Sequence, residues 1–490
     1  MLRKIRTILA IVVLALLTLL FVDFTGTMQW TSVLGKIQFL PAVLAVNLIV
    51  VAVLIVLTLV FGRIYCSVIC PLGILQDLLA RLNRKKLPYS FSKAKNWLRT
   101  GVLVVFVVCM LLGATSLAAL IAPYSTFGRI CQNLLQPVWM WGNNLLAMAA
   151  EKMDSYALGQ VDVWIHSWPA FIISAVTLVV IAVLAIRGGR TWCNTICPVG
   201  TVLGFLSRFS WLKIAIDTDK CINCGKCAKK CKASCIDSKN HKVDYSRCVV
   251  CGNCLENCTV HALSYKHVPS KAQAQGEAKD HDAGRRAFVV GAALASAGAT
   301  WAQEKKKVDG GLAPILDKVA PERQTALLPP GSLSAAHMQQ HCTACQLCVS
   351  KCPENVLRPS TKLATLMQPE MSYERGYCRP ECNACSEVCP TGAIKPITLE
   401  VKSSTQIGHA VWIKKNCIPV AEGNQCHACV THCPVEAITL VPLNPDDEKS
   451  VKIPAVNEAR CIGCGACENL CPARPYSAIY VEGHEVHKEI

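Results

Sequence analysis

The sequence predicts a membrane-embedded bundle of four α-helices joined to α+β ferredoxin-like iron–sulfur domains. Two observations predict this fold: long apolar segments fill the N-terminal part of the chain, and the 31 cysteines stand mostly in tight groups of four. A mean hydropathy of +0.35 agrees with an apolar membrane part joined to a polar part. No cleavable N-terminal signal peptide is evident, so the grouped cysteines indicate metal ligands and not a disulfide framework.

Four apolar segments supply the predicted spans, at 8–22, 41–61, 102–121 and 171–186. Each is near the ~20 residues that a bilayer requires. Basic residues precede the first segment and follow the second and the fourth, whereas the loop 123–168 contains few. Because positive charge stays on the cytoplasmic side, the N-terminus and the end of the fourth span are predicted to be cytoplasmic. Much of the net charge of +17 is thereby explained, and no nucleic-acid partner is expected.

The ends of the second and fourth spans carry the same sequence box, Gly-Arg-x-aromatic-Cys-x3-Cys-Pro-x-Gly, at 62–73 and 189–200. This repeat indicates two helix pairs related by an axis along the membrane normal. Cysteines four apart on a helix share one face. The four box cysteines are therefore predicted to converge at the cytoplasmic surface: Cys66, Cys70, Cys193 and Cys197. Two interpretations stay open, an additional redox or metal site and the packing of small buried side chains.

Two cysteine quartets after the fourth span predict a cytoplasmic two-cluster ferredoxin domain at 216–268, following a membrane domain at 1–215. Both have the spacing Cys-x2-Cys-x2-Cys-x3-Cys. Three close thiolates hold one [4Fe–4S] cluster and the fourth cysteine reaches the neighbouring cluster, whereas zinc sites use separate Cys-x2-Cys pairs. The predicted ligand sets are Cys221, Cys224, Cys227 and Cys258 for one cluster, and Cys248, Cys251, Cys254 and Cys231 for the other.

Four more quartets predict a domain with four [4Fe–4S] clusters at 332–490, which brings the expected total to six. A proline follows the fourth cysteine of each quartet. The spacing leaves the pairing open, because the first quartet can exchange its fourth cysteine with the second or with the fourth quartet. The ligands are the same either way: Cys342, Cys345, Cys348, Cys352, Cys378, Cys382, Cys385, Cys389, Cys417, Cys426, Cys429, Cys433, Cys461, Cys464, Cys467 and Cys471.

The two halves are joined by a predicted linker at 269–331, which contains Arg285 and Arg286 before a short apolar run at 289–300. A paired arginine before such a run is typical of a twin-arginine export signal. The alternative is an ordinary linker helix with two solvated arginines. The run is short for a spanning helix, so four or five spans are expected. Export would place 332–490 in the periplasm and divide the protein between two compartments.

Together these motifs resemble two known families joined end to end. Residues 1–265, with four spans, two Cys-x3-Cys-Pro boxes and two clusters, resemble the NapH/MauN family of membrane ferredoxin-type proteins. Residues 283–490, with paired arginines and four clusters, resemble the NapG/MauM family. The resemblance implies a quinol dehydrogenase component of the bacterial inner membrane. It would pass electrons from the membrane quinone pool to a periplasmic reductase of the nitrate reductase type, or to a cytochrome c partner.

The residues themselves indicate a conduit for electrons. There is no Gly-x-Gly-x-x-Gly or Walker loop for a nucleotide, and no residue is identified as catalytic. One-electron carriers beside a bilayer suit transfer from a two-electron lipid carrier to a soluble partner. Proton acceptors for quinol are sought among loop residues on the non-cytoplasmic side: Asp23, Glu151, Asp154, Asp162 and His166. The alternative is a redox-sensing or maturation accessory protein for a respiratory metalloenzyme, but six clusters on two sides favour the conduit.

Replacing Arg285 and Arg286 by lysine should keep the C-terminal domain in the cytoplasm while the apolar segments stay inserted, because twin-arginine signals are addresses read by a receptor. A reporter fused after Ile490 measures the location in both compartments. An unchanged location would show that the arginines act only as topology charges.

Overall fold

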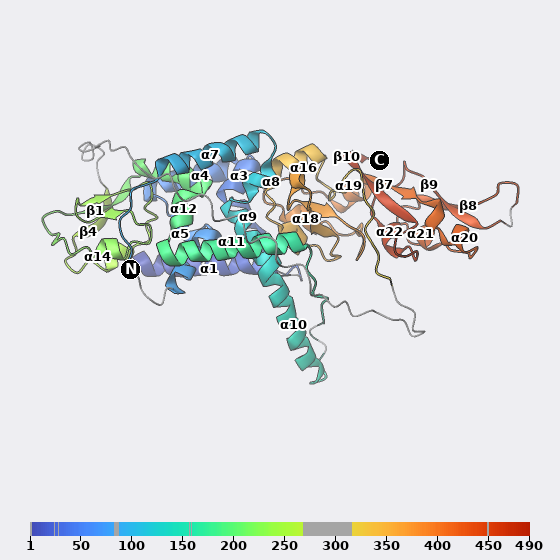
Figure 1. Cartoon of the computed structure of the whole chain (residues 1–490), viewed down its shortest axis with the longest axis horizontal. Coiled ribbons are helices and arrows are strands. Elements are labelled where there is room, and N and C mark those ends of the chain that lie inside the picture. The colour runs from blue at the N-terminus through green and yellow to red at the C-terminus, as the bar shows by residue number, and fades with distance from the viewer. Residues whose placement is uncertain are drawn as a thin grey trace, which may run out of the picture.

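The computed structural model describes residues 2–23, 25–27, 29–82, 88–155, 157, 159–267, 316–447 and 450–490. These residues form an elongated molecule with three parts in a row (Figure 1): a ferredoxin-like unit, a layer of helices, and the C-terminal domain. The predicted export signal at 285–302 lies outside the described residues.

Four apolar helices run along the long axis of the middle part: α1 (Leu2–Val22), α4 (Leu48–Phe61), α7 (Asn96–Leu111) and α11 (Trp168–Gly188). They alternate in direction, since α1 and α7 begin beside the ferredoxin-like unit whereas α4 and α11 end there. Within the described ranges, α1 and α11 are the two helices long and apolar enough to cross a membrane. Length and composition alone are weak evidence, because a core helix or a signal sequence passes the same test.

The other two predicted spans are interrupted, so the predicted four-span bundle is not confirmed. The segment 41–61 divides into α3 (Phe39–Leu44) and α4, because Val46 is left-handed (φ 54°) and the Asn47 side chain caps α4. The segment 102–121 divides at Gly113 (φ 76°) into α7 and α8 (Thr115–Ala119). At 14 and 16 residues, α4 and α7 are shorter than the ~20 residues that a bilayer requires.

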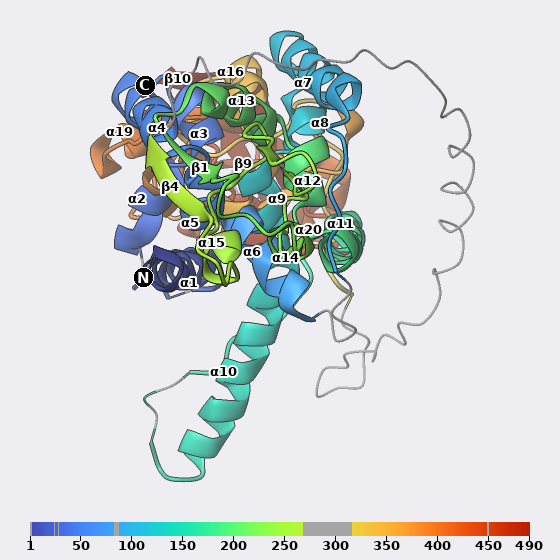
Figure 2. The ribbon, with the colours of Figure 1, turned by 90° about the vertical axis from the view of Figure 1, so that its left-hand side faces the viewer.

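Short helices fill both ends of this layer. Toward the ferredoxin-like unit lie α5 (Tyr65–Val68), α6 (Pro71–Leu79), η2 (Ala80–Leu82), α12 (Thr191–Thr195), α13 (Pro198–Leu206) and η4 (Ser207–Phe209). Toward the other end lie η1 (Gln29–Ser32), α2 (Val33–Lys36), α9 (Pro123–Ile130) and the π-helix η3 (Cys131–Leu135). Helix α10 (Gln136–Glu151) continues from η3 and projects away from the body (Figure 2).

The ferredoxin-like unit is built from two small antiparallel sheets. Strand β1 (Leu212–Ile216) pairs with β4 (Leu263–His267), and β2 (Ile236–Asp237) pairs with β3 (Lys242–Val243). The one-turn helices α14 (Lys226–Lys229) and α15 (Asn253–Glu256) lie between the strands in sequence. Because β1 belongs to this sheet, the unit begins slightly before the predicted boundary at 216.

The C-terminal domain contains three two-stranded antiparallel sheets. The pairs are β5 (Leu357–Pro359) with β6 (Pro369–Met371), β7 (Thr405–Trp412) with β10 (Ile479–Glu489), and β8 (Ile438–Pro442) with β9 (Lys452–Val456). Its helices are α16 (Ala335–His341), α17 (Leu347–Ser350), η6 (Leu363–Thr365), α18 (Ala384–Val388), α19 (Leu399–Ser404), η7 (Lys414–Asn416), α20 (Ile418–Ala421), α21 (Ala428–Thr431) and α22 (Ala466–Leu470).

The C-terminal domain begins earlier than the predicted boundary at 332. Leu327 and Leu328 are buried in its core. Lys318 donates hydrogen bonds to the backbone carbonyls of Glu468 and Asn469 at 2.6 and 2.7 Å. The described residues 316–331, which we expected to act as a tether, therefore belong to the folded domain.

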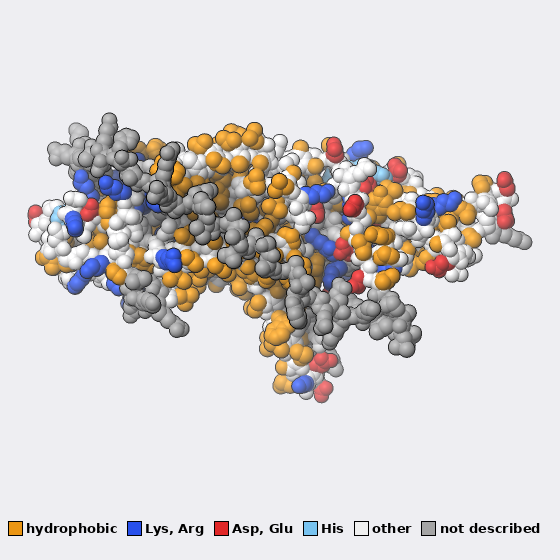
Figure 3. All heavy atoms as spheres, in the orientation of Figure 1, with side chains coloured by type: hydrophobic (Ala, Val, Ile, Leu, Met, Phe, Trp, Pro, Cys, Tyr) orange, Lys and Arg blue, Asp and Glu red, His pale blue; other side chains and the backbone are white. Residues whose placement is uncertain are grey.

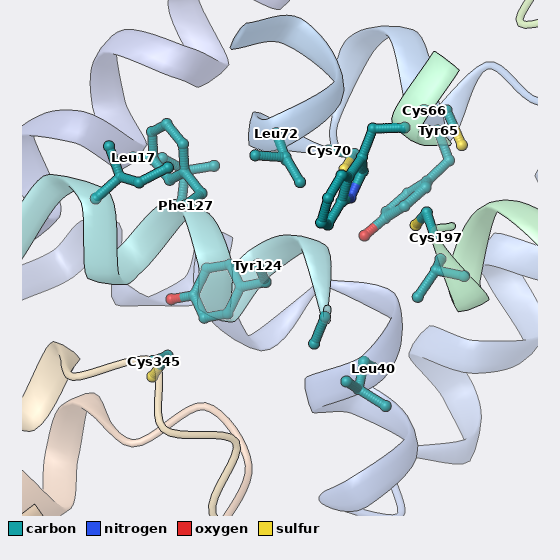
Figure 4. Close-up of a cluster of buried hydrophobic side chains, with 14 of the residues drawn as sticks. Leu17, Leu40, Tyr65, Cys66, Cys70, Leu72, Tyr124, Phe127, Cys197 and Cys345 are labelled. Atoms are coloured by element: carbon teal, nitrogen blue, oxygen red, sulfur yellow. The ribbon is translucent and has the colours of Figure 1, made fainter. Parts of the chain in front are cut away.

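This domain docks directly on the far end of the helical layer. The Lys351 ammonium lies 2.7 Å from the Asp23 carboxylate, and the two side chains are only 3% and 10% exposed. Asn133 of η3 donates to the Gln346 side chain at 2.7 Å. Residues of both parts share one buried apolar cluster (Figure 4): Phe21, Tyr124, Phe127, Cys345, Leu347 and Val388. The contact is thus a packed interface with a buried ion pair.

Lys351→Met should weaken this docking by about 3–5 kcal/mol, because it leaves the Asp23 carboxylate buried without its partner. Adding Asp23→Asn should restore much of the loss. Thermal unfolding and protease cleavage between the two parts measure the effect. The matched control is Arg375→Met, which breaks the exposed interface pair with Asp162 and should cost less than about 1 kcal/mol. Equal losses in the two variants would contradict the prediction.

Candidate iron–sulfur sites

The first cysteine site of the ferredoxin-like unit combines residues of two quartets. Cys221, Cys224 and Cys227 line one cavity together with Cys258 of the following quartet. This is the exchange that the spacing predicts. In the second site, Cys231 lies near enough to the Cys251 and Cys254 thiols to raise their pKa, although burial is the larger cause. The two predicted ligand sets are therefore brought together as expected.

The backbone explains why three close thiols converge. In each quartet with the regular spacing, the residue before the second cysteine and the residue after it both have positive φ. The pairs are Asn223 and Gly225, Val250 and Gly252, Ala344 and Gln346, and Gly463 and Gly465. Left-handed residues fold the chain back on itself, so successive cysteines face a common point. Four of these residues are not glycine, and they hold a strained conformation that the surrounding fold maintains: Asn223, Val250, Ala344 and Gln346.

The structure resolves the pairing that the sequence left open in the C-terminal domain. Cys352 of the first quartet shares a cavity with Cys378, Cys382 and Cys385 of the second. Cys471 of the fourth quartet shares a cavity with Cys417, Cys426 and Cys429 of the third. The reverse exchanges agree, because Cys389 lies near the thiols of Cys342, Cys345 and Cys348, and Cys433 lies near Cys461 and Cys464. The first quartet pairs with the second, and the third with the fourth.

The three cavities fit one kind of occupant. They contain about 420, 390 and 360 Å³ of empty space, part of it open to solvent, and each is lined by four cysteines. Within the described part of the chain, no three His, Cys, Asp or Glu side chains are grouped closely enough to hold a single metal ion. A cubane is bound differently, because each thiolate takes a separate iron atom. The donor sets and cavities therefore fit [4Fe–4S] clusters.

The four C-terminal sites form a row that starts at the helical layer. Cys345 of the first site is buried against Tyr124 of α9 (Figure 4). The second site is joined to the first because each takes its fourth cysteine from the other quartet. The second site also adjoins the fourth, because the Cys378 N–H donates to the Cys464 carbonyl at 2.9 Å. The fourth site is joined to the third by the same exchange of fourth cysteines. The third site lies at the far end, among α20, α21 and β9 (Figure 1).

The four box cysteines also lie together, and all four are buried. Cys197 is near enough to Cys193, Cys70 and Cys66 for their charges to raise its pKa, after burial as the larger cause. The predicted single helix through each pair is wrong. Cys66 belongs to α5, whereas Cys70 is the N-cap of α6 with extended backbone, because Pro71 excludes the helical conformation from the residue before it. Each box forms two short helices, and the four thiols converge between them below the surface.

The arginines of the two boxes bind across the repeat. Arg63 donates to the Cys193 carbonyl at 3.3 Å, and Arg190 donates to the Cys66 carbonyl at 2.6 Å. Both arginines are fully buried. The last glycine of each box is needed here, because a Cβ at Gly73 would lie 2.7 Å from the Arg190 guanidinium and one at Gly200 would lie 3.0 Å from that of Arg63. The arginines, the cysteine carbonyls and the last glycines of the two boxes thus form one pseudo-symmetric core.

Asp77 is a central residue that the sequence analysis missed. It accepts two hydrogen bonds from Arg190 at 2.9 and 2.8 Å and lies near Arg6 and Lys232. Burial alone would raise the pKa of this carboxyl, but Arg190, Lys232 and Arg6 outweigh it and hold the pKa well below its usual range. The available signal was that Asp77 is the one acidic residue from 24 to 150.

The remaining predicted residues occupy different parts of the structure. Cys109 lies in α7, and Cys131 lies in η3 within the buried cluster that also contains Cys345. The Cys235 sulfur lies 3.5 Å from that of Cys231, next to a predicted ligand. Of the proton-acceptor candidates, Asp23 is paired with Lys351 and Asp162 with Arg375. His166 lines a large pocket between the helical layer and the C-terminal domain.

Three sequence profiles of iron–sulfur families match four stretches of the chain. The 4Fe–4S binding domain matches 43–90 and 167–217, which contain the two boxes. The 4Fe–4S dicluster domain matches 244–356 and, separately, 424–474. Together with the cysteine sites, these matches define the class: this is a ferredoxin-type 4Fe–4S protein.

Curated relatives narrow the class. The chain is 32% identical over 167 residues to the ferredoxin-type protein MauM of Methylophilus methylotrophus, covering 32% of this chain and 71% of the relative. It is 32% identical over 177 residues to NapG of Escherichia coli, covering 33% and 75%. The chain therefore belongs to the family of MauM and NapG ferredoxin-type proteins.

Two other relatives are covered less completely. The match to MauM of Methylobacillus flagellatus is 35% identical and spans 30% of this chain and 64% of the relative. A putative electron transport protein of Escherichia coli, YccM, is 31% identical over 204 residues, which is 42% of this chain and 50% of YccM. These similarities agree with a role in electron transport.

The resolved pairing predicts which substitutions act on the same cluster. Cys471→Ser should remove about four iron atoms, because Cys471 completes the site of Cys426. Adding Cys426→Ser should remove no more iron, whereas adding Cys345→Ser should remove about four further atoms. Iron and sulfide analysis of anaerobically prepared protein measures these losses. The reverse pattern would support exchange between the first and fourth quartets.

Proposed function

We propose that this protein is an electron-transfer component of a bacterial inner membrane, which takes electrons from quinol and delivers them to a periplasmic reductase. One observation carries the proposal: a row of four cysteine sites leads away from a helical layer whose apolar surface is exposed. The ferredoxin-like unit lies at the opposite end of that layer (Figure 1).

The exposed surface of the helical layer is suited to lipid. The long helices α1 and α11 bury only 33% and 22% of their most apolar windows. Ile8, Ile49, Val105 and Val179 on four different helices are each more than half exposed. Figure 3 shows that apolar side chains dominate the middle of the molecule, while charged side chains gather toward the ends. So much exposed apolar surface in one band marks a membrane or a partner.

Exposed aromatic side chains flank this band at both ends. Beside the ferredoxin-like unit stand Trp97, Phe205, Phe209 and Trp211, and at the other end stand Trp30, Trp139, Trp141 and Trp168. Trp is enriched where a membrane meets water, because its ring is apolar and its N–H is polar. The two groups mark the two faces of a bilayer. Helix α10, which carries Trp139 and Trp141 and projects sideways, would then lie along the second face.

The charge distribution supports the proposed orientation. Basic residues of the helical layer gather beside the ferredoxin-like unit: Arg3, Lys4, Arg6, Arg63, Arg99, Arg187, Arg190 and Arg208. Positive charge stays on the cytoplasmic side. The ferredoxin-like unit would therefore be cytoplasmic and the C-terminal domain periplasmic, as the proposed export signal at 285–302 requires. Interrupted helices such as α3–α4 and α7–α8 can still lie within a membrane where protein covers the break.

The arrangement of cysteines supports a direction of transfer. [4Fe–4S] clusters supply one-electron carriers when bound. The first site packs on the helical layer and exchanges its fourth cysteine with the second, so this pair of sites lies nearest to a lipid-soluble donor. The third site is farthest from the layer, and its Cys426 and Cys429 are partly exposed. We therefore assign the docking of the soluble partner to the end of the domain that holds Cys417, Cys426 and Cys429.

The four box cysteines are proposed as an additional redox or metal site. They are buried together at the cytoplasmic end of the helical layer, and the profile of a 4Fe–4S binding domain covers both pairs. Iron content distinguishes the possibilities: six clusters correspond to about 24 iron atoms and seven to about 28.

The quinol proposal is tested with purified protein in detergent. A reduced quinol analogue should bleach the iron–sulfur absorbance. In Cys417→Ser the bleaching of the other centres should remain, but electron delivery to the periplasmic partner should fall at least about tenfold, because the terminal site is lost. Cys109→Ser serves as the control and should change neither quantity. Normal delivery by Cys417→Ser would refute the proposed exit, and no bleaching of the unaltered protein would refute quinol as the donor.

A further inference from the structure

A large pocket lies where the C-terminal domain meets the helical layer. It encloses about 1350 Å³ of empty space, much more than the cysteine-lined cavities, and part of it is open to solvent. One wall is the start of α11 with His166, Ser167, Trp168 and Pro169. The other wall comes from 320–327 and from the β5–β6 pair of the C-terminal domain. Neither part forms the pocket alone, so it exists only in the docked protein.

The pocket opens at the proposed membrane surface. Trp168, one of its lining residues, belongs to the group of exposed aromatic side chains at the periplasmic end of the helical layer. The next turns of α11 present Ile172 and Val176 on the outside of the molecule, each more than half exposed. An apolar tail could therefore follow α11 in the lipid while its polar ring enters the pocket.

The two walls offer complementary polar groups. His166 stacks on Trp164 at 4.3 Å between ring centroids. Burial, followed by the nearby charges of Arg358 and Arg375, lowers the pKa of His166 to about 4, so its ring is neutral near pH 7 and can accept a hydrogen bond. On the opposite wall, the Nε and Nη2 groups of Arg358 are buried without a hydrogen-bond partner, as is the Ser372 hydroxyl. Unpaired buried donors of this kind call for an acceptor.

A cysteine site lies directly behind the pocket. Met371 lines the pocket on one side and the cavity of the second cluster site on the other. Met371 itself is buried. A ring held in the pocket would thus be separated from the cavity of Cys352, Cys378, Cys382 and Cys385 by this side chain.

We propose that this composite pocket binds the ring of the membrane quinol, with His166 accepting a hydrogen bond from one ring hydroxyl and Arg358 donating to the other ring oxygen. The inference rests on the proposed function and adds the site to it. It also explains why the C-terminal domain is docked by a buried ion pair: the docked arrangement completes the site.

The test uses 2-heptyl-4-hydroxyquinoline N-oxide, a fluorescent quinol analogue, with the full-length protein in detergent. His166→Phe removes the acceptor while it keeps a ring that can stack on Trp164, and it should weaken binding about 3- to 10-fold, the effect of one hydrogen bond. Thr361→Trp places a large ring into the pocket from an exposed lining position and should weaken binding at least about tenfold. The matched control is His267→Phe, because His267 also packs on a tryptophan, Trp211, but at the ferredoxin end. Iron content verifies that each variant is folded.

The outcomes separate the site from the function. Weaker binding in both pocket variants, with unchanged binding in His267→Phe, supports the pocket. If the unaltered protein binds the analogue and both pocket variants bind equally well, the pocket is refuted while quinol oxidation stands. If the unaltered protein neither binds the analogue nor is bleached by quinol, the proposed function fails and the pocket assignment fails with it.

Discussion

The pairing of Arg190 with Asp77 is the interaction on which the core of the helical layer depends. Arg190 is fully buried, and a guanidinium there is tolerable only because Asp77 accepts two hydrogen bonds and the Cys66 carbonyl accepts a third. The same carboxylate lies near Arg6 of α1 and Lys232 of the ferredoxin-like unit. One buried charge thereby connects both boxes, the first helix and the residue that follows Cys231.

The arginine of the first box, Arg63, is also buried, but among the described residues its hydrogen-bond partners include no acidic side chain. Arg63 donates to the Ser246 carbonyl and to the Asn194 side chain, at 2.9 and 3.0 Å. Ser246 stands two residues before Cys248, so this arginine also holds the edge of a cluster site. The two boxes therefore position the ferredoxin-like unit from two sides.

At the other end of the helical layer, the docking of the C-terminal domain sets the order in which its four cysteine sites lie relative to the layer. The quartets exchange their fourth cysteines in pairs, and such an exchange alone does not say where a chain of carriers begins. The Asp23–Lys351 pair and the burial of Cys345 place one site at the helical layer. The backbone hydrogen bond from Cys378 to Cys464 then places the fourth site next to the second. The order of the four sites relative to the helical layer is therefore set by this interface and not by any single quartet.

The sequence alone determined what depends on short-range spacing. Three cysteines within seven residues can hold only one cluster. The spacing of the cysteines between Cys221 and Cys258 was therefore enough to predict the ligand sets of the ferredoxin-like unit. The apolar segments were also evident, but the breaks at Val46 and Gly113 were not, because a left-handed residue inside an apolar run changes neither composition nor hydropathy. Only the tertiary structure decided the pairing of the C-terminal quartets, the crossed arginines of the boxes, the place of Asp77 and the pocket beside His166. Each of these joins residues that are far apart in the chain, and long-range contacts leave no local pattern from which they could be predicted.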